Sequence, residues 1–230
     1  MLETLKERVC RANLRLVAEG LVMQTWGNVS GVDREGGFFV IKPSGVPYDD
    51  MKPEQMVVVS LETGDVVEGD LRPSSDTPTH LELYRAFAEV GSVVHAHSLY
   101  ATAWAQAQHE IPCFGTTHAD FCHGPVPCTR PLKAAEIDEE YEANTGRVIV
   151  ERFRSIHPRQ TPAVLVAEHG PFAWGVDPDQ AVLTAVTLEQ VARIASETLR
   201  IDPAVEPISR DLMEKHFLRK HGPDAYYGQT

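Results

Sequence analysis

The stretch Val93-Val94-His95-Ala96-His97 places two histidines at the end of a short, apolar, β-branched run. β-branched residues favour strands, and alternate side chains of a strand point to the same face. If the run is a strand, both imidazoles can therefore reach one metal ion. Neutral imidazole nitrogen suits Zn²⁺, and a catalytic zinc site typically uses three protein ligands and keeps one position open.

A third candidate ligand is His169, which follows the apolar run at residues 163–167 and precedes Gly170-Pro171. Gly and Pro mark the point where a chain turns out of a strand. The alternative is that these histidines are simply buried and hydrogen-bonded. The close pairing of His95 with His97, and the similar position of His169, favour a metal site. Iron, manganese or cobalt would also suit three imidazoles.

The elements around these runs alternate between helix and strand. Apolar periodicity and capping residues predict helices at residues 2–20, 77–89, 98–108, 133–143 and 177–200, and strands at residues 38–41, 56–61, 66–67, 93–97 and 163–167. The Gly-, Pro-, Thr- and His-rich segment 111–131 is expected to be a loop. The turn Thr63-Gly64-Asp65 predicts a hairpin, so the sheet is not purely parallel. We expect an α/β fold, a three-layer α/β/α sandwich with a central mixed, largely antiparallel sheet.

Composition limits the class of protein. A chain of 230 residues with 43% hydrophobic content can bury one sizeable core, which predicts a single domain over residues 1–230. A formal net charge of −12 argues against nucleic-acid or anionic-membrane partners, because polyanions need a positive field. No signal-type or membrane-spanning apolar run occurs, so we expect a cytoplasmic protein. The four cysteines form no C-x-x-C pair and are expected to be reduced.

Three short segments are candidates for a phosphate pocket. Lys42-Pro43-Ser44-Gly45 follows a predicted strand, and Ser74-Ser75 precedes the predicted helix start at Thr77-Pro78. Helix N-termini attract anions through unpaired N–H groups and the helix dipole, and a lysine adds positive charge. Gly27-Asn28 could add an amide side chain and a close backbone approach. The alternative for each segment is an ordinary turn.

Two aspartates lie beside these loops, Asp76 and Asp120. Either carboxylate could bind the metal or transfer protons. Asp76 could instead cap the helix that begins near Thr77. Asp120 lies in a segment where capping is less needed, which favours acid–base work.

The motifs also support a family resemblance. They are Trp26-Gly27-Asn28-Val29-Ser30, Lys42-Pro43-Ser44-Gly45, Ser74-Ser75-Asp76-Thr77-Pro78-Thr79-His80, His95-Ala96-His97-Ser98, Gly115-Thr116-Thr117-His118-Ala119-Asp120 and His169-Gly170-Pro171-Phe172-Ala173-Trp174-Gly175. With them the chain closely resembles bacterial L-ribulose-5-phosphate 4-epimerases of the class II aldolase superfamily. The resemblance runs nearly end to end and includes Leu218-Arg219-Lys220-His221-Gly222 and Tyr226-Tyr227-Gly228-Gln229.

The resemblance implies a metal-dependent isomerase with one Zn²⁺ per subunit, held by Asp76, His95, His97 and His169. It implies contacts to a small phosphorylated ketopentose from Gly27, Asn28, Lys42, Ser44, Gly45, Ser74 and Ser75. The implied reaction interconverts L-ribulose 5-phosphate and D-xylulose 5-phosphate by retro-aldol cleavage and aldol recombination. It further implies a four-fold homotetramer with active sites between subunits, where Asp120 and Tyr227 of a neighbouring subunit transfer the protons. Such an activity would serve arabinose, ascorbate or other pentose catabolism.

Alternatives remain open from the residues alone. A class II aldolase acting on fuculose or rhamnulose phosphate would release the aldehyde, a non-catalytic adducin-type module would lack the metal, and Lys42 could form a Schiff base. The histidines argue against the non-catalytic module. Glu168 flanks His169 and departs from the family pattern, so an extra carboxylate could raise metal affinity or alter the hydrogen bonds around the ligands.

Overall fold

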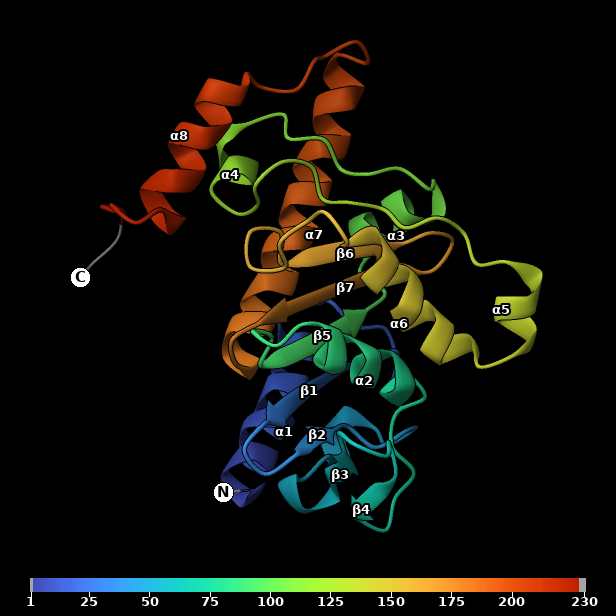
Figure 1. Ribbon diagram of the computed structural model, residues 1–230. Coiled ribbons are helices and arrows are strands. Elements are labelled where there is room, and N and C mark those ends of the chain that lie inside the picture. Colours follow the sequence, from blue (N-terminus) through green and yellow to red (C-terminus); the bar gives the residue numbers. More distant parts are fainter. Residues whose placement is uncertain (1, 228–230) are drawn as a thin grey trace.

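The computed structural model describes residues 2–227, and its centre is a seven-stranded sheet in the order β4-β3-β2-β1-β5-β7-β6 (Figure 1). The strands are β1 (Gly27–Asp33), β2 (Phe38–Ile41), β3 (Val57–Ser60), β4 (Val66–Glu68), β5 (Ser92–Ala96), β6 (Ala163–Val166) and β7 (Gly170–Gly175). Each neighbouring pair is antiparallel, and the only parallel bridge in the described chain joins Cys128 to Leu165. The prediction of a largely antiparallel sheet is therefore confirmed.

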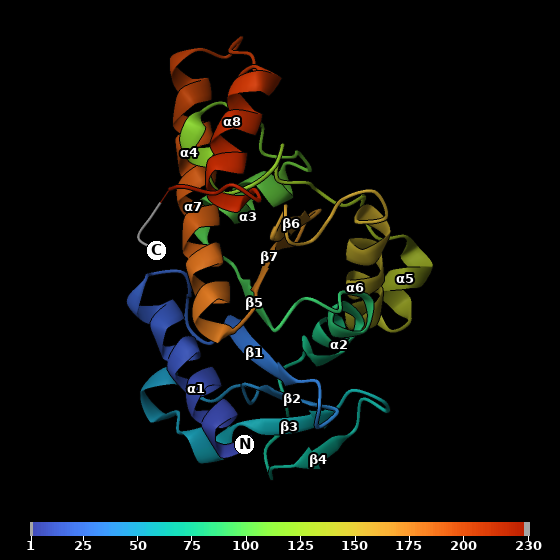
Figure 2. The ribbon, with the colours of Figure 1, turned by 60° about the vertical axis from the view of Figure 1, so that its left-hand side comes forward.

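Helices cover both faces of the sheet. They are α1 (Leu2–Ala18), α2 (Thr77–Ala86), α3 (Leu99–Gln106), α4 (Thr116–Ala119), α5 (Ala134–Asp138), α6 (Tyr141–Arg152), α7 (Pro178–Ile201) and α8 (Arg210–His221), with short 3₁₀ turns at Tyr48–Asp50 and Pro53–Gln55. Figure 2 shows α1, α3 and α7 on one side of the sheet and α2, α5 and α6 on the other. The predicted three-layer sandwich is confirmed.

Strand β5 contributes to the core on both of its faces. Val94 and Ala96 lie in a buried cluster with Leu188 of α7, whereas Val93 lies in a second buried cluster with Ile149 of α6. This is the alternation that a strand requires. Since β1 and β7 flank β5, the backbone of β5 is hydrogen-bonded to a neighbouring strand along both of its edges.

Several elements differ from the sequence prediction. β1 and β7 were not predicted because glycines, Asn28 and Pro171 are poor strand formers, and burial between neighbouring strands overrides that preference. The helix predicted at residues 133–143 is divided into α5 and α6, and α4 lies within the predicted loop. Helix α8 was also missed, because Phe217 is its only buried residue and no apolar stripe marks it.

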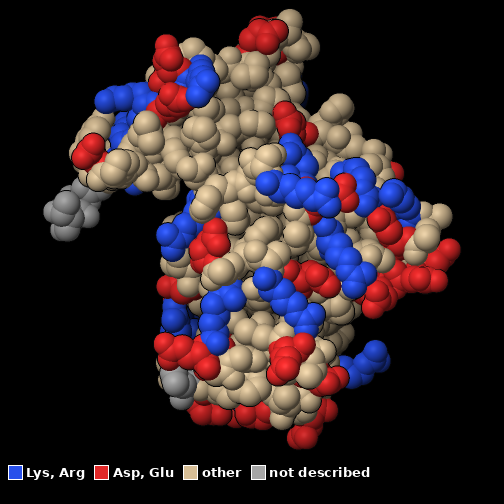
Figure 3. Space-filling model, in the orientation of Figure 1, with Lys and Arg blue, Asp and Glu red and all other residues tan. Residues whose placement is uncertain are grey.

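The charges on the surface agree with the net negative charge of the sequence. Acidic side chains gather at the end of the molecule formed by β3 and β4 and along the edge that carries α5 (Figure 3). No helix within residues 2–227 has the length and apolar character to cross a bilayer. All four cysteines are free thiols, as predicted.

A buried amide fastens α1 to β1. Asn13 is fully buried, and its side chain donates to the carbonyls of Val9 (2.8 Å) and Val29 (3.0 Å) and accepts from the amide N–H of Val29 (2.8 Å). A buried backbone N–H without a partner is costly.

Asn13→Ala should therefore lower the free energy of unfolding by about 2–3 kcal/mol, because it leaves buried backbone groups of Val29 unsatisfied. Urea denaturation measures the change. Gln190→Ala, which removes an exposed amide from α7, is the control and should change stability by less than about 0.5 kcal/mol. Equal effects of the two substitutions would contradict the assignment.

Candidate active site

Three histidines converge at the end of β5. His95 lies within the strand, His97 follows its last residue, and His169 lies in the turn between β6 and β7. Their metal-ligating atoms all lie within 4.8 Å of one another, and the two Nε2 atoms of His95 and His97 are 3.1 Å apart. The three residues chosen from sequence are thus brought together.

The ring of His95 is fixed from two sides. Its Nδ1 lies 2.9 Å from the carbonyl oxygen of Pro171, and the ring stacks on Phe172 at 4.2 Å between centroids. Because a carbonyl oxygen only accepts, Nδ1 carries the proton and Nε2 presents a lone pair to the other histidines. This is the arrangement that orients a metal-ligating imidazole.

The donor set suits a cation. Burial lowers the pKa of His95, His97 and His169, the last to about 4, so the three rings are neutral at pH 7. Neutral rings bring nitrogen lone pairs together, and lone pairs at this separation repel unless a proton or a cation lies between them. His169 Nδ1 is buried and has no hydrogen-bond partner among the described residues. A bound divalent metal would satisfy these atoms.

Two carboxylates near the histidines behave differently from each other. Asp76 lies at the N-terminus of α2 but makes no side-chain capping bond, so the capping alternative does not describe it. Its Oδ2 instead accepts a 2.6 Å hydrogen bond from Asn28 Nδ2. Glu168 is exposed, and its carboxylate accepts from Gln108 Nε2 at 3.0 Å. Neither belongs to the three-histidine group, and a role for Asp76 as fourth ligand remains a prediction.

Asp76 is nevertheless tied electrostatically to the cluster. Burial raises the pKa of its carboxyl, but the neighbouring His95 and the hydrogen bond from Asn28 hold that pKa below the ordinary value. The carboxylate is therefore charged at neutral pH. A negative charge beside three neutral imidazoles favours a cation.

The segments predicted to bind phosphate lie next to each other. Asn28 pairs with His95 across β1 and β5, and Asn28 Nδ2 donates to Ser74 Oγ at 3.1 Å. The backbone of Ser74 donates to the carbonyl of Lys42 at 2.9 Å, which joins the loop of Ser74 and Ser75 to that of Ser44 and Gly45. The hydroxyls of Ser44 and Ser75 lie on exposed residues.

Lys42, Gly27 and Gly45 also have specific places among these loops. Lys42 is buried, with its Nζ over the Tyr48 ring at 4.9 Å, and burial lowers its pKa. The carbonyl of Gly27 accepts from the Tyr48 hydroxyl at 2.7 Å. Gly45 adopts a φ of +70°, which favours glycine at that turn.

Asp120 lies apart from the histidines, under α8. It accepts from Arg219 through both carboxylate oxygens (3.1 and 2.7 Å) and contacts His216 Nδ1 at 3.0 Å. Burial raises the pKa of Asp120, but the hydrogen bonds from Arg219 and His216 hold it below the ordinary value. The carboxylate therefore fastens α8 to the turn after α4.

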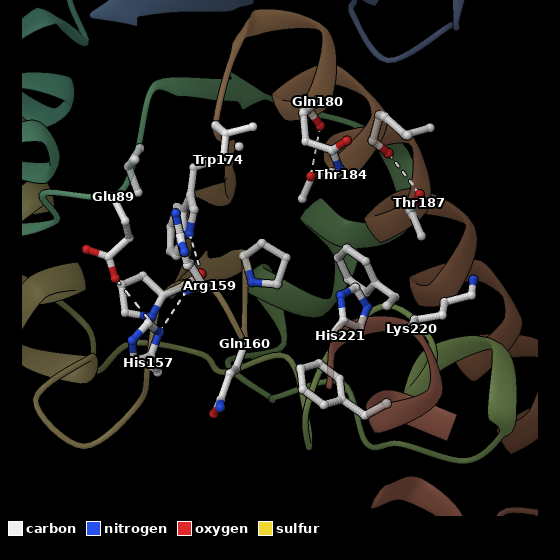
Figure 4. A pocket seen from close by; sticks show the side chains of 18 of the residues that line it. Glu89, His157, Arg159, Gln160, Trp174, Gln180, Thr184, Thr187, Lys220 and His221 are labelled. Carbon is white, nitrogen blue, oxygen red and sulfur yellow. Dashed lines mark hydrogen bonds and ion pairs between the residues drawn. The ribbon is translucent and has the colours of Figure 1, made fainter. Parts of the chain in front are cut away.

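A cavity of about 850 Å³ lies beside Asp120, between α8 and the body of the protein. Its wall includes Trp174, Gln180, Lys220 and His221, which face the same space in Figure 4, and the hollow beneath α8 is visible in Figure 3. None of the three clustered histidines lines it.

Tyr227 also lies at this end of the molecule. More than half of the residue is exposed, and its ring packs against Arg219 and Lys220, each charged atom 4.6 Å from the centroid. In Figures 1 and 2, α8 lies on the opposite side of the molecule from α6, whose first residue, Tyr141, is near His169. One chain therefore does not bring Asp120 and Tyr227 to its own histidines.

Sequence reasoning missed some residues around the histidines. The ring of Tyr141 lies 6.2 Å from that of His169, and Phe172 stacks on His95. His80 is fully buried, with Nδ1 2.7 Å from Ser30 Oγ. Phe172 lies in β7, which local signals did not predict, and no local pattern distinguishes Tyr141.

Three neutral histidines gathered at the end of a central strand, in a three-layer α/β/α fold, are a donor set that could hold a divalent metal. Residues 7–196 match the family described as Class II Aldolase and Adducin N-terminal domain. The chain belongs to this family.

Relatives are similar over almost the whole chain. The sequence is 56% identical over 228 residues to L-ribulose-5-phosphate 4-epimerase UlaF of Salmonella paratyphi B, covering 99% of this chain and 100% of that protein. Solved structures include an L-fuculose 1-phosphate aldolase (TM-score 0.79, 25% identity, 93% and 94% of the two chains). Another is the L-fuculose-1-phosphate aldolase of Thermus thermophilus (TM-score 0.69, 26% identity, 89% and 100%). The predicted resemblance to the epimerases is confirmed.

Asp120→Asn should loosen α8, because it removes the charge from a two-point pair with Arg219 worth about 1–2 kcal/mol. Hydrogen exchange of α8 amides should become roughly 5–30-fold faster at pH 7. The lowered pKa of Asp120 means that the stabilisation is present above about pH 4 and is lost on acidification below it. Asp211→Asn, an exposed change on α8, is the control, and equal exchange in both variants would refute the role.

Proposed function

We propose that this chain is a zinc-dependent L-ribulose-5-phosphate 4-epimerase, which interconverts L-ribulose 5-phosphate and D-xylulose 5-phosphate. The observation that carries the proposal is the convergence of three neutral imidazoles beside an amide and hydroxyl cradle, in a chain similar end to end to an epimerase. Cytoplasmic location and a place in pentose catabolism belong to the same proposal.

His95, His97 and His169 would hold the metal, with Asp76 as a further ligand or as the charge that balances it. When bound, Zn²⁺ would stabilise the negative charge that develops when the bond between the third and fourth carbons breaks. The carbonyl of Pro171 and the face of Phe172 keep His95 in the required orientation. Asn28 holds Asp76 through its amide.

The phosphate would bind over the loops of Ser44, Gly45, Ser74 and Ser75, next to Gly27, Asn28 and Lys42. Hydrogen bonds between these loops keep their positions relative to β1 and β5. A held phosphate tethers the glycolaldehyde phosphate fragment while it turns to present its other face, so recombination remains intramolecular.

Opposite faces of the carbonyl require proton transfer from opposite sides, and we assign these steps to Asp120 and Tyr227 of a neighbouring subunit. The support is that both residues lie away from the histidines of their own chain. A closed ring of subunits, the homotetramer implied by the family resemblance, would bring the α8 end of one subunit to the histidines of the next.

The chief alternative is an aldolase, since solved structures of L-fuculose 1-phosphate aldolases share the fold. Their identity to this chain is 25–26%, against 56% for the epimerase. Incubation with L-ribulose 5-phosphate should yield D-xylulose 5-phosphate, followed by a coupled assay or by ¹³C NMR. Release of dihydroxyacetone and glycolaldehyde phosphate without any epimer would overturn the proposal.

Removing the metal should abolish the activity. Purified protein should carry about one Zn²⁺ per subunit, and exhaustive chelation should remove both metal and turnover. Added Zn²⁺ should restore turnover. His97→Ala should lose the metal, whereas His109→Ala, at an exposed histidine, should keep it. Full activity in demonstrably metal-free protein would refute the zinc assignment.

Sites shared between subunits predict complementation. Asp120→Asn and His97→Ala should each be inactive alone. Unfolded and refolded together at equal amounts, they should regain about a quarter of wild-type activity, because one interface in four then joins two intact halves. A mixture that stays inactive, although mass spectrometry shows mixed oligomers, would place the whole site within one chain.

A further inference from the structure

Helix α3 lies close to all three histidines of the cluster. It begins at Leu99, two residues after His97. At its other end the carbonyl of Ala105 accepts a 2.9 Å hydrogen bond from the backbone N–H of Glu168, the residue before His169. The position of α3 therefore bears directly on the separation between His97 and His169.

The first turn of α3 is capped from a distant part of the chain. Ser98 occupies the N-cap position but its side chain makes no capping bond. Instead Glu189 of α7 accepts from the amides of Tyr100 (2.8 Å) and Ala101 (2.9 Å), one on each carboxylate oxygen. Only 9% of Glu189 is exposed. Backbone amides, rather than a basic side chain, are thus the hydrogen-bond donors to this buried carboxylate, and the positive end of the helix favours its charge.

The last turn of α3 is fastened as well. Glu168 and Gln108 both adopt left-handed backbone conformations, with φ of 65° and 59°. Non-glycine residues adopt this region rarely, and surrounding contacts must maintain it. Here the maintaining contacts are the Glu168 amide bond to Ala105 and the 3.0 Å bond between the two side chains. The carboxylate beside His169 is thus bonded to Gln108, two residues beyond the end of α3, and does not belong to the histidine cluster.

The middle of α3 lies directly against the turn that carries His169. A Cβ atom placed on Gly170 would lie 3.6 Å from Thr102 Oγ1 of α3, 3.7 Å from His95 Cε1 and 3.3 Å from the carbonyl of Ala96. The first two distances are ordinary van der Waals contacts and the third is tight, so helix, strand and turn are packed together at Gly170. Because protein interiors are close-packed, a shift of α3 would be felt at this turn.

We propose that Glu189 is a positioning residue for the histidine cluster. By capping α3 from α7, it fixes the helix that sets the distance between His97 and His169. The contact between Glu168 and Gln108 fixes the other end of the same helix. The inference rests on the proposed metal site, because ligand distance matters only if a cation is bound. Residues that orient ligands typically contribute about 10–100-fold to metal affinity.

The experiment measures Zn²⁺ affinity of metal-free protein by competition with a chromophoric chelator. Glu189→Gln retains one acceptor oxygen in the same shape and should weaken affinity by about 3–10-fold, and Glu189→Ala by about 10–100-fold. Gln108→Ala, at an exposed position, should weaken it by a smaller factor. Glu197→Gln, the same change at a half-exposed glutamate further along α7, is the matched control and should leave affinity unchanged.

A second readout separates positioning from mere stability. The visible absorption of Co²⁺-loaded protein reports coordination geometry, so its bands should shift in both Glu189 variants and not in Glu197→Gln. Thermal unfolding of the metal-free forms gives the stability change independently. Glu189 variants that lose stability but keep wild-type zinc affinity and cobalt bands would overturn the inference. Wild-type protein that binds no metal would instead overturn the proposed metal site itself.

Discussion

The site depends on strand β5 being buried on both faces. Val94 and Ala96 fix it to the α7 layer, while Val93 and His95 face the α2 and α6 layer, where the His95 ring stacks on Phe172. Antiparallel partners on both sides prevent the strand from sliding, because a shift of one residue would move every side chain to the opposite face. His95 therefore has one possible position, opposite Asn28 on β1 and Phe172 on β7.

Much of this could be predicted from local signals. The two-residue spacing of His95 and His97, and the capping pair Asp177-Pro178, are complete within a few residues. Asp177 indeed accepts from the amide of Gln180 at the start of α7. By contrast, β1 and β7 have compositions that disfavour strands, and pairing with a neighbouring strand on each side forms them. The capping of α3 by Glu189 joins residues 89 positions apart, so no sequence window contains it.

The predicted site residues lie in two separate groups in the structure, and the composition of the chain does not predict this separation. The predicted metal ligands and substrate-binding residues lie together, because hydrogen bonds join Asn28 to Ser74 and Asp76 and join Ser74 to Lys42, and Asn28 pairs with His95. Asp120 and Tyr227 lie at the α8 end with Arg219. The family resemblance implied that they act from another subunit, and the fold is consistent with that, since α8 protrudes beyond the sheet (Figure 2).

The bidentate pair between Asp120 and Arg219 gives one carboxylate two duties. It is the carboxylate proposed above to carry a proton, and it also attaches the last helix to the body of the protein, together with buried Phe217. A kinetic defect after its replacement would thus combine the loss of the proposed proton transfer with a displacement of α8. The same linkage means that any movement of α8 also changes the charge around this carboxylate, because Arg219, His216 and Lys220 all belong to that helix.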